Sequence, residues 1–382
     1  MRERLLIPVL GLGQIVAFAS SYYLLGVLAD PVAADFRMRP ATVFSALSAA
    51  FLLSALITPA AGRAIERFGG QLVQAFAHAA FATALVIMAT AINSEMLWAG
   101  ITLLGVGMGT GLYGTAFAIV VERRGADARR GITAVSLIGA LGGGLGWPIT
   151  KAMSEAGDWR SACLAWAFTH LLICLPMTLL ALSPRQSDAK NVTPEGRISW
   201  DRPMVQLAAL FAGAWFVSTA MGAHLPRILG ALGMKASDAA WAAGMMAGCA
   251  ISARLIDLIW LHRAHPLATV RLACLFHPVG ASAALLGGVK FAPLLAVGQG
   301  FGNGLLSVAS GVLPLKVFGP ERYAVRQAML LTPARYLQAA APATYAIALD
   351  RSTALALTLS GGLCLMMLVL SVGLNRGETT AD

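Results

Sequence analysis

The chain has 382 residues, of which 58% are hydrophobic and 12% are charged. Soluble domains carry about 25% charged residues, so this composition excludes an ordinary soluble protein and indicates that lipid is part of the chain's solvent. The net charge of +10 does not indicate nucleic-acid binding, because the basic residues lie in short loops between apolar runs.

Twelve apolar runs are long enough to cross a bilayer, which takes roughly 20 residues in a helix. In chain order they cover residues 7–29, 41–61, 72–92, 97–121, 131–152, 160–182, 204–229, 237–260, 266–289, 293–316, 325–348 and 353–375. The first run is too long for a signal-peptide core and lacks a clear cleavage site, so we expect it to be retained. We predict an all-α membrane protein with an N-terminal bundle (1–182), a cytoplasmic linker (183–203) and a C-terminal bundle (204–382).

The distribution of basic residues predicts that both ends of the chain are cytoplasmic. With the N-terminus inside, the inner segments hold 19 of the 28 Lys and Arg residues and the outer segments hold 8, while Arg335 lies within a predicted span. Basic residues accumulate on the cytoplasmic side of membrane proteins. The bias therefore supports an even number of spans.

An internal repeat relates the two halves of the sequence. A shift of 191 residues aligns residues 62–66 (GRAIE) with residues 253–257 (ARLID), and it also aligns the glycines at 107, 109 and 111 with those at 298, 300 and 302. Because six spans is an even number, the halves would have the same orientation in the membrane, related by an axis along the membrane normal.

Residues 62–71 (GRAIERFGGQ) resemble the signature loop that follows the second span in the major facilitator superfamily. Glu66 stands where that pattern usually has Asp, and Gln71 stands where a basic residue is common. The topology and the half-chain repeat agree with this resemblance, which covers essentially the whole chain. It implies a transporter of twelve helices in two six-helix, pseudo-symmetric bundles, similar to bacterial permeases of small organic acids and metabolites.

The resemblance also implies a gating role for the charges of this loop. In the superfamily the acid and the arginine form a cytoplasmic latch between helices that separate as the carrier opens inward, and a charge-assisted pair is strong when partly desolvated. We expect Glu66 and Arg67, with Arg63 beside them, to act this way, and Arg254 and Asp257 to be their degenerate counterparts. Alternatively, Arg254 and Asp257 pair with each other, or these charges only fix the orientation of the chain.

Arg335 is the strongest candidate for a substrate-binding residue. It falls near the middle of the span 325–348, where a charge is costly unless it is hydrated or paired and is functional by default. No carboxylate occurs at a comparable depth, and Asp30, Glu122, Asp257 and Asp350 all lie near span ends. We therefore predict that Arg335, with no acid at its depth, faces a water-filled cavity and binds an anion, since its fork suits carboxylate or phosphate. The alternative is a structural arginine that donates to helix carbonyls or to Gln338.

Further candidates lie on the first, fourth, seventh and tenth spans, which line the cavity in the superfamily. The polar residues on these spans, together with the neighbours of Arg335, are Gln14, Tyr22, Tyr23, Tyr113, Trp215, Gln299, Asn303, Tyr336 and Gln338. We expect them to complete the substrate contacts. The alternative is that such side chains bond neighbouring helices.

Histidines, cysteines and glycines also occur inside the apolar runs. His78, His170 and His277 lie on spans that are peripheral in the superfamily, so we expect them to snorkel or to be locally bonded. His224 and Asp30 are candidates for proton coupling, although Asp30 alternatively caps a turn with Pro31. The five cysteines fit neither a disulfide framework nor a metal site, and we read them as small buried hydrophobes. The glycine-rich stretch 139–148 indicates close helix packing.

Together these features predict a secondary active transporter that moves a small organic anion, a carboxylate, across a bacterial inner membrane by alternating access with proton coupling. The alternative is a proton-driven exporter of a drug or amphipathic metabolite. A membrane enzyme or sensor is disfavoured because the sequence contains no nucleophile–base pair, metal cluster or large soluble domain. We expect a multi-pass monomer in the lipid bilayer, with no cofactor and no nucleic-acid partner.

Overall fold

The structure, a computed structural model, describes residues 2–182 and 198–374, and every regular element in these ranges is a helix. The chain forms two compact units. Unit 1 comprises Met1–Trp200 and Phe318–Thr332, and unit 2 comprises Asp201–Val317 and Pro333–Asp382. The long helix α14 (Tyr323–Arg351) therefore begins in unit 1 and continues in unit 2.

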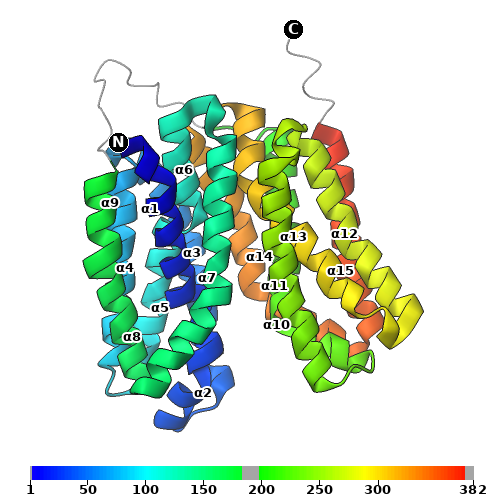
Figure 1. Cartoon of the computed structure of the whole chain (residues 1–382), viewed down its shortest axis with the longest axis horizontal. Helices are drawn as coiled ribbons and strands as arrows, with labels where there is room; N and C mark the ends of the chain where they lie inside the picture. The colour runs from blue at the N-terminus through cyan, green and yellow to red at the C-terminus, as the bar shows by residue number, and fades with distance from the viewer. Residues whose placement is uncertain (1, 183–197, 375–382) are drawn as a thin grey trace. The chain divides into compact units, whose positions relative to one another are not determined.

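The first six predicted spans correspond to helices of unit 1, several of which run end to end. In chain order these are α1 (Arg2–Ala17), the π-helical turn η1 (Phe18–Tyr22), α2 (Leu25–Asp35), α3 (Pro40–Phe68), α4 (Gly70–Ala89), α5 (Ser94–Gly111), α6 (Tyr113–Arg124), the 3₁₀ turn η2 (Gly125–Ala128), α7 (Arg129–Ala156), α8 (Trp159–Phe168), the π-helical turn η3 (Thr169–Cys174) and α9 (Leu175–Ala181). Within the unit, α1 packs along α7, and α4 packs along α5, α8 and α9 (Figure 1).

The last six predicted spans correspond to six long helices. These are α10 (Arg202–Ala231), α11 (Ala236–Ile259), α12 (Pro266–Gly287), α13 (Pro293–Phe318), α14 and α15 (Thr353–Leu374). Short 3₁₀ turns, η4 (Leu261–Arg263) and η5 (Gly288–Lys290), lie on either side of α12. Within unit 2, α15 packs against both α10 and α12.

Nine stretches of the described residues are long and apolar enough to cross a membrane. One of them, Ser94–Ala156, has 63 residues and runs through α5, α6 and α7, so it holds more than one crossing. The helices α11 and α14 fall outside the nine, but with 24 and 29 residues each is long enough to span a bilayer.

Two local predictions are corrected by the structure. Asp30 and Pro31 do not form a turn at the end of the first span, because both lie inside α2, which continues to Asp35. A proline is tolerated there because membrane helices re-satisfy the freed backbone groups locally. The fourth span is not one continuous helix, since Leu112 has an extended backbone between α5 and α6. This break opens the last carbonyls of α5 to side-chain donors.

Alternating glycines pack the fourth and tenth spans in the same manner, which supports the internal repeat. A Cβ added at Gly105 would collide with the carbonyl of Ala50 on α3, and one at Gly300 would collide with the carbonyl of Met246 on α11. The glycines that face these second-span helices are Gly105, Gly109, Gly300 and Gly304, and those that face the third-span helices α4 and α12 are Gly107, Gly111, Gly298 and Gly302. The absence of side chains lets the helix backbones approach closely.

The glycine-rich stretch of α7 allows close packing, as predicted. A Cβ at Gly142 would lie 2.9 Å from the carbonyl oxygen of Ile15 on α1, and a Cβ at Gly146 would lie 2.6 Å from Cβ of Ala19 on η1. Small residues at such contacts give membrane helices dispersion contacts that larger side chains would prevent. The first span is therefore seated directly on α7.

The cysteines are all free thiols, as the sequence predicts. Four of them are buried, but Cys249 is only half-buried, so the expectation of uniform burial is wrong at that position.

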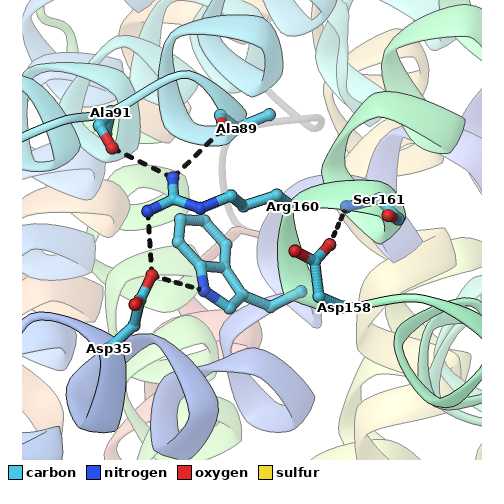
Figure 2. Close-up of polar contacts among 7 residues, drawn as sticks. Asp35, Ala89, Ala91, Asp158, Arg160 and Ser161 are labelled. Atoms are coloured by element: carbon cyan, nitrogen blue, oxygen red, sulfur yellow. Dashed lines mark hydrogen bonds and ion pairs between the residues drawn. The ribbon is translucent and has the colours of Figure 1, made fainter.

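Arg160, at the start of α8, ties together the ends of three spans of unit 1 (Figure 2). Its guanidinium donates to the carbonyl oxygens of Ala89 and Ala91, at the end of α4, over 3.1 and 2.9 Å. It also lies 2.8 Å from Oδ2 of Asp35, which accepts a further hydrogen bond from the indole N–H of Trp159. A cation at the C-terminus of α4 also interacts favourably with the helix dipole.

Candidate functional site

The predicted tyrosines of unit 1 come together in one aromatic cluster. The ring of Phe18 lies 4.7 Å from that of Tyr113 and about 6 Å from those of Tyr22 and Tyr23. The hydroxyl of Tyr113 donates to the carbonyl of Ser136 on α7 over 3.0 Å. Tyr22 and Tyr23 are half-buried.

The glycines of α7 make room for this cluster. A Cβ at Gly139 would lie 2.8 Å from the hydroxyl oxygen of Tyr113, and a Cβ at Gly143 would lie 3.0 Å from the ring of Tyr23. The stretch that the sequence links to helix packing thus also positions two of the predicted substrate contacts.

Gln14 lies deeper than the tyrosines and is fully buried. Its amide nitrogen donates to the carbonyl oxygen of Gly111 over 2.8 Å, and Gln74 of α4 donates to the same oxygen over 3.2 Å. Gly111 is the last residue of α5, where the helix break exposes the carbonyl. The oxygen atoms of both amides are buried and have no hydrogen-bond partner.

His78 and His170 form a buried pair next to Gln74. Their Nδ1 atoms lie 3.0 Å apart, Nε2 of His170 lies 2.8 Å from the hydroxyl of Ser20, and Nε2 of His78 lies 3.4 Å from the amide nitrogen of Gln74. Both histidines are at most 1% exposed. They do not snorkel, so that part of the prediction is wrong, and the expectation of local bonding is confirmed.

The signature loop packs through its glycines and its glutamine. Gly69 has φ 83° and ψ 151°, a conformation that essentially only glycine adopts. The amide nitrogen of Gln71 donates to the carbonyls of Leu179 and Leu182, over 2.9 and 2.5 Å, at the end of α9. An amide therefore caps a helix end at the position where the family pattern commonly has a base.

Glu66 of this loop pairs with a residue from the second half of the sequence. Its Oε2 lies 3.6 Å from Nε of Arg322, which directly precedes α14, and both side chains are 28% exposed. Both residues belong to unit 1. Arg63 and Arg67 are exposed. The loop acid is therefore the group that contacts the start of α14, and Gly62 allows close packing there against Ala328.

In unit 2, Arg335 is the thirteenth of the 29 residues of α14 and is half-buried. It also interacts with another group of the protein, and its binding of an anion stays a prediction. Its neighbour Tyr336 is exposed, whereas Gln338 is buried. The only acid of α14 is Asp350, whose carboxylate lies 2.5 Å from the guanidinium of Arg227.

Gln299 and Asn303 share one face of α13, as their spacing predicts, and line a small pocket inside unit 2. His277 of α12 lines the same pocket, with its Nε2 2.9 Å from the hydroxyl of Ser360. His277 is therefore locally bonded, and it is 2% exposed. The pocket has room for about one water molecule, which is too small for an organic anion in this structure.

The remaining predicted residues lie on α2, α10 and α11. Arg254 and Asp257 are buried in α11, where Arg254 donates to the carbonyl of Ala250 over 2.8 Å. Nε2 of His224 lies 2.8 Å from the carbonyl oxygen of Pro342, and Asp30 is exposed on α2. Trp215 is half-buried on α10. The predicted substrate contacts are thus divided between the two units.

The sequence model of the Major Facilitator Superfamily matches residues 10–337. The chain belongs to this superfamily. A search of curated proteins finds no match. The superfamily consists of membrane transporters, which agrees with the prediction of a multi-pass membrane carrier.

Solved structures of superfamily members share the fold over nearly their whole length. They include the transporter FucP in an outward conformation (TM-score 0.76, 13% identity, covering 96% of this chain and 98% of that one). They also include the human organic anion transporter MFSD10 (TM-score 0.74, 15% identity, covering 97% of this chain and 99% of that one). A third is the proton:xylose symporter XylE with a bound glucose derivative (TM-score 0.73, 13% identity, covering 95% of this chain and 94% of that one). At these identities the likeness shows the superfamily fold and leaves the solute open.

Sequence reasoning missed the polar network around the histidine pair. Three of its members, Ser20, Gln74 and Gly111, were not among the candidate residues. The available signal was a glutamine and a histidine four residues apart, at 74 and 78, within an apolar run. The π-helical turns that carry Ser20 and His170 left no pattern in the sequence.

Proposed function

We propose that this superfamily member moves a small organic anion, in the first instance a carboxylate, by alternating access. Arg335 is the residue that binds the anion. Tyr336, the next residue of the same unit, supplies a hydroxyl group. We further propose that protons drive the movement and that the protein resides in a bacterial inner membrane as a monomer.

The observation that supports an anionic solute is a fixed positive charge in the middle of α14. Arg335 is half-buried, so its charge is partly desolvated. The nearest acid along the helix, Asp350, is engaged by Arg227. In such a setting a planar guanidinium binds a carboxylate through two parallel, charge-assisted hydrogen bonds. The solved neighbours move different solutes, so they do not select one.

The helix around Arg335 also supports a polar cavity. Pro333 and Pro342 lack backbone N–H groups, so the carbonyls of Met329 and Gln338, four residues earlier in each case, lack their usual helix partners. Irregular backbone at membrane depth is tolerated where it is buried in protein or lines a water-filled cavity. Polar backbone groups and a guanidinium therefore occur within a few residues of each other.

Transport by the purified protein tests this proposal. A thermal-shift screen against small organic acids first identifies a ligand, and uptake of that radiolabelled acid into proteoliposomes is then measured. We expect Arg335→Gln to lower uptake by roughly 10- to 100-fold, because a hydrogen bond to a charged group contributes about 1.5–3 kcal/mol. Arg335→Lys keeps the charge but loses the fork, so we expect partial activity.

Arg227→Gln is the matched control, because it removes another arginine of unit 2 that is engaged with Asp350 at an exposed position. We expect it to retain most of the uptake. Uptake that is unchanged by Arg335→Gln would exclude Arg335 as the anion site. A screen in which only neutral or cationic compounds stabilise the protein would contradict the anionic solute itself.

A further inference from the structure

We propose that the buried pair His78–His170 is the proton-binding site of this carrier and that Gln74 accepts the hydrogen bond that the bound proton creates. This inference rests on the proposed proton coupling and replaces His224 and Asp30 as the coupling groups. The pair joins the third span, through α4, to the sixth span, through η3. Ser20 adds a contact from η1 of the first span.

One arrangement of protons satisfies every contact of the network in its neutral state. The amide of Gln74 donates to Nε2 of His78, so His78 must carry its proton on Nδ1. Nδ1 of His78 then donates to Nδ1 of His170, and Nε2 of His170 donates to the hydroxyl oxygen of Ser20. All donors point in one direction along the row Gln74–His78–His170–Ser20.

The same network has a place for one additional proton. A second proton on His78 converts Nε2 into a donor, which faces the amide nitrogen of Gln74, also a donor. Rotation of that amide by a half-turn presents its oxygen instead. This oxygen is buried and has no hydrogen-bond partner in the neutral arrangement. The added charge is then shared across the short Nδ1–Nδ1 contact, which is a charge-assisted hydrogen bond.

Rotation of Gln74 connects proton binding to the helix break of the fourth span. In the neutral arrangement the carbonyl of Gly111 accepts from both Gln74 and Gln14. When Gln74 turns, that carbonyl loses one of its two donors at the junction between α5 and α6. Gln14 and Tyr113 both pack on Gly139, so the route from the histidine pair ends beside the aromatic cluster.

The surroundings favour a proton over a metal ion. Cys174 lies close enough to both histidines for the three side chains to hold a metal, and in the described residues this is the only such group. The facing Nδ1 atoms are 3.0 Å apart, as in a hydrogen bond. A metal would need a lone pair from both atoms and a deprotonated thiol. Gly13 of α1 and the ring of Phe81 also lie against the pair and add no charge, so the bound proton is stabilised by Gln74 and by the hydrogen bond between the two rings.

Histidine nitrogen spectra test the site without knowledge of the solute. We expect solid-state ¹⁵N spectra of the full-length protein in lipid nanodiscs to show the pair taking up one proton as the pH is lowered from about 8. The signals of both rings should change together. In His170→Asn the signal of His78 should no longer follow that transition, because the shared hydrogen bond is lost.

His277→Asn is the matched control, because His277 is also buried and its ring also contacts a serine, Ser360. It differs from His170, which contacts a serine and a second histidine. His277→Asn should leave the transition unchanged. Gln74→Glu keeps both histidines and adds a carboxylate acceptor, so the transition should move to higher pH. This variant retains the side-chain size and guards against a folding defect in His170→Asn. The proposal would be overturned if both imidazole rings stayed neutral over the whole pH range. It would also be overturned if the transition of Gln74→Glu occurred at the same pH as that of the unmodified protein.

Two further measurements separate this inference from its competitors. Stoichiometric zinc in the purified protein, together with spectra that change on chelation, would identify a metal site and overturn the proton site. In proteoliposomes, His78→Gln should abolish the stimulation of uptake by an inward proton gradient while exchange of the anion across the membrane persists. If no organic anion is transported but the pair still titrates, only the proposed solute fails.

Discussion

Asp158 accepts a hydrogen bond from the backbone N–H of Ser161 over 2.7 Å at the start of α8, and this bond lowers the pKa of its carboxyl (Figure 2). It is therefore the N-cap of the sixth span. Next to it, Arg160 holds the ends of α2 and α4. Single residues at helix ends thus fix where the spans of unit 1 begin and end.

The N-cap predicts a pH-dependent contribution to stability. Because the carboxyl has a lower pKa in the folded protein than its ordinary value of about 3.9, its stabilising effect is present above that value and is lost as the pH falls through the folded pKa. We expect Asp158→Ala to lower stability by about 1 kcal/mol at neutral pH, measured as thermal unfolding in detergent. Asp158→Asn should retain the cap and lose the pH dependence, and identical melting of all three proteins at neutral pH would contradict the cap.

At the scale of elements, the first span and α7 approach each other closely because α7 presents glycines to its neighbour. Gly142 and Gly146 face Ile15 and Ala19, whereas Gly144 of the same helix has no atom within 4 Å of the position of a Cβ. The two kinds of glycine therefore have different roles, although they are indistinguishable in the sequence.

This difference predicts opposite effects of the same substitution. Gly146→Ala places a methyl group 2.6 Å from Cβ of Ala19, so we expect a loss of about 1–3 kcal/mol from overpacking. Gly144→Ala meets open space, and the helix propensity of alanine should leave stability unchanged or raise it by up to about 1 kcal/mol. Unfolding by a graded denaturant in detergent compares the two. Equal destabilisation by both variants would show that Gly146 is not at a close contact.

At the scale of the whole molecule, α14 joins the two units through its continuous backbone. Its start belongs to unit 1 and is held by the pair Glu66–Arg322, whereas Arg335 lies in the part that belongs to unit 2. Arg322, which directly precedes this helix, and the proposed anion site are therefore thirteen residues apart along one continuous stretch of chain. If Glu66 has the proposed gating role, the cytoplasmic latch is its ion pair with Arg322, directly before the start of α14.

The latch predicts coupling between Glu66 and Arg322. Nε of Arg322 lies 3.6 Å from Oε2 of Glu66, and each side chain is 28% exposed, so the pair should contribute less than about 1 kcal/mol to stability. Its effect on uptake should be larger, because Glu66→Gln or Arg322→Gln removes an interaction that biases the conformational equilibrium. The exchanged variant Glu66→Arg with Arg322→Glu should restore part of the uptake. Additive losses in the double-mutant cycle would mean that the two residues do not act as a pair.

The sequence by itself determined the elements of this protein. Twelve apolar runs predicted the helices, because spanning a bilayer requires a minimum apolar length and internal backbone hydrogen bonds. The signature loop and the repeated glycines predicted the superfamily fold. The position of Arg335 within its helix also followed directly, since a charge in an apolar run is visible without knowledge of its neighbours.

Only the tertiary structure decided which polar groups meet. His78 and His170 are 92 residues apart, and Glu66 and Arg322 are separated by most of the chain. Their contacts depend on helix rotation, on π-helical turns and on the break at Leu112, none of which hydrophobic periodicity encodes in helices that are apolar on most sides. Arg335 illustrates the same limit, because its position within its helix was readable from the sequence but its contacts within the protein were not.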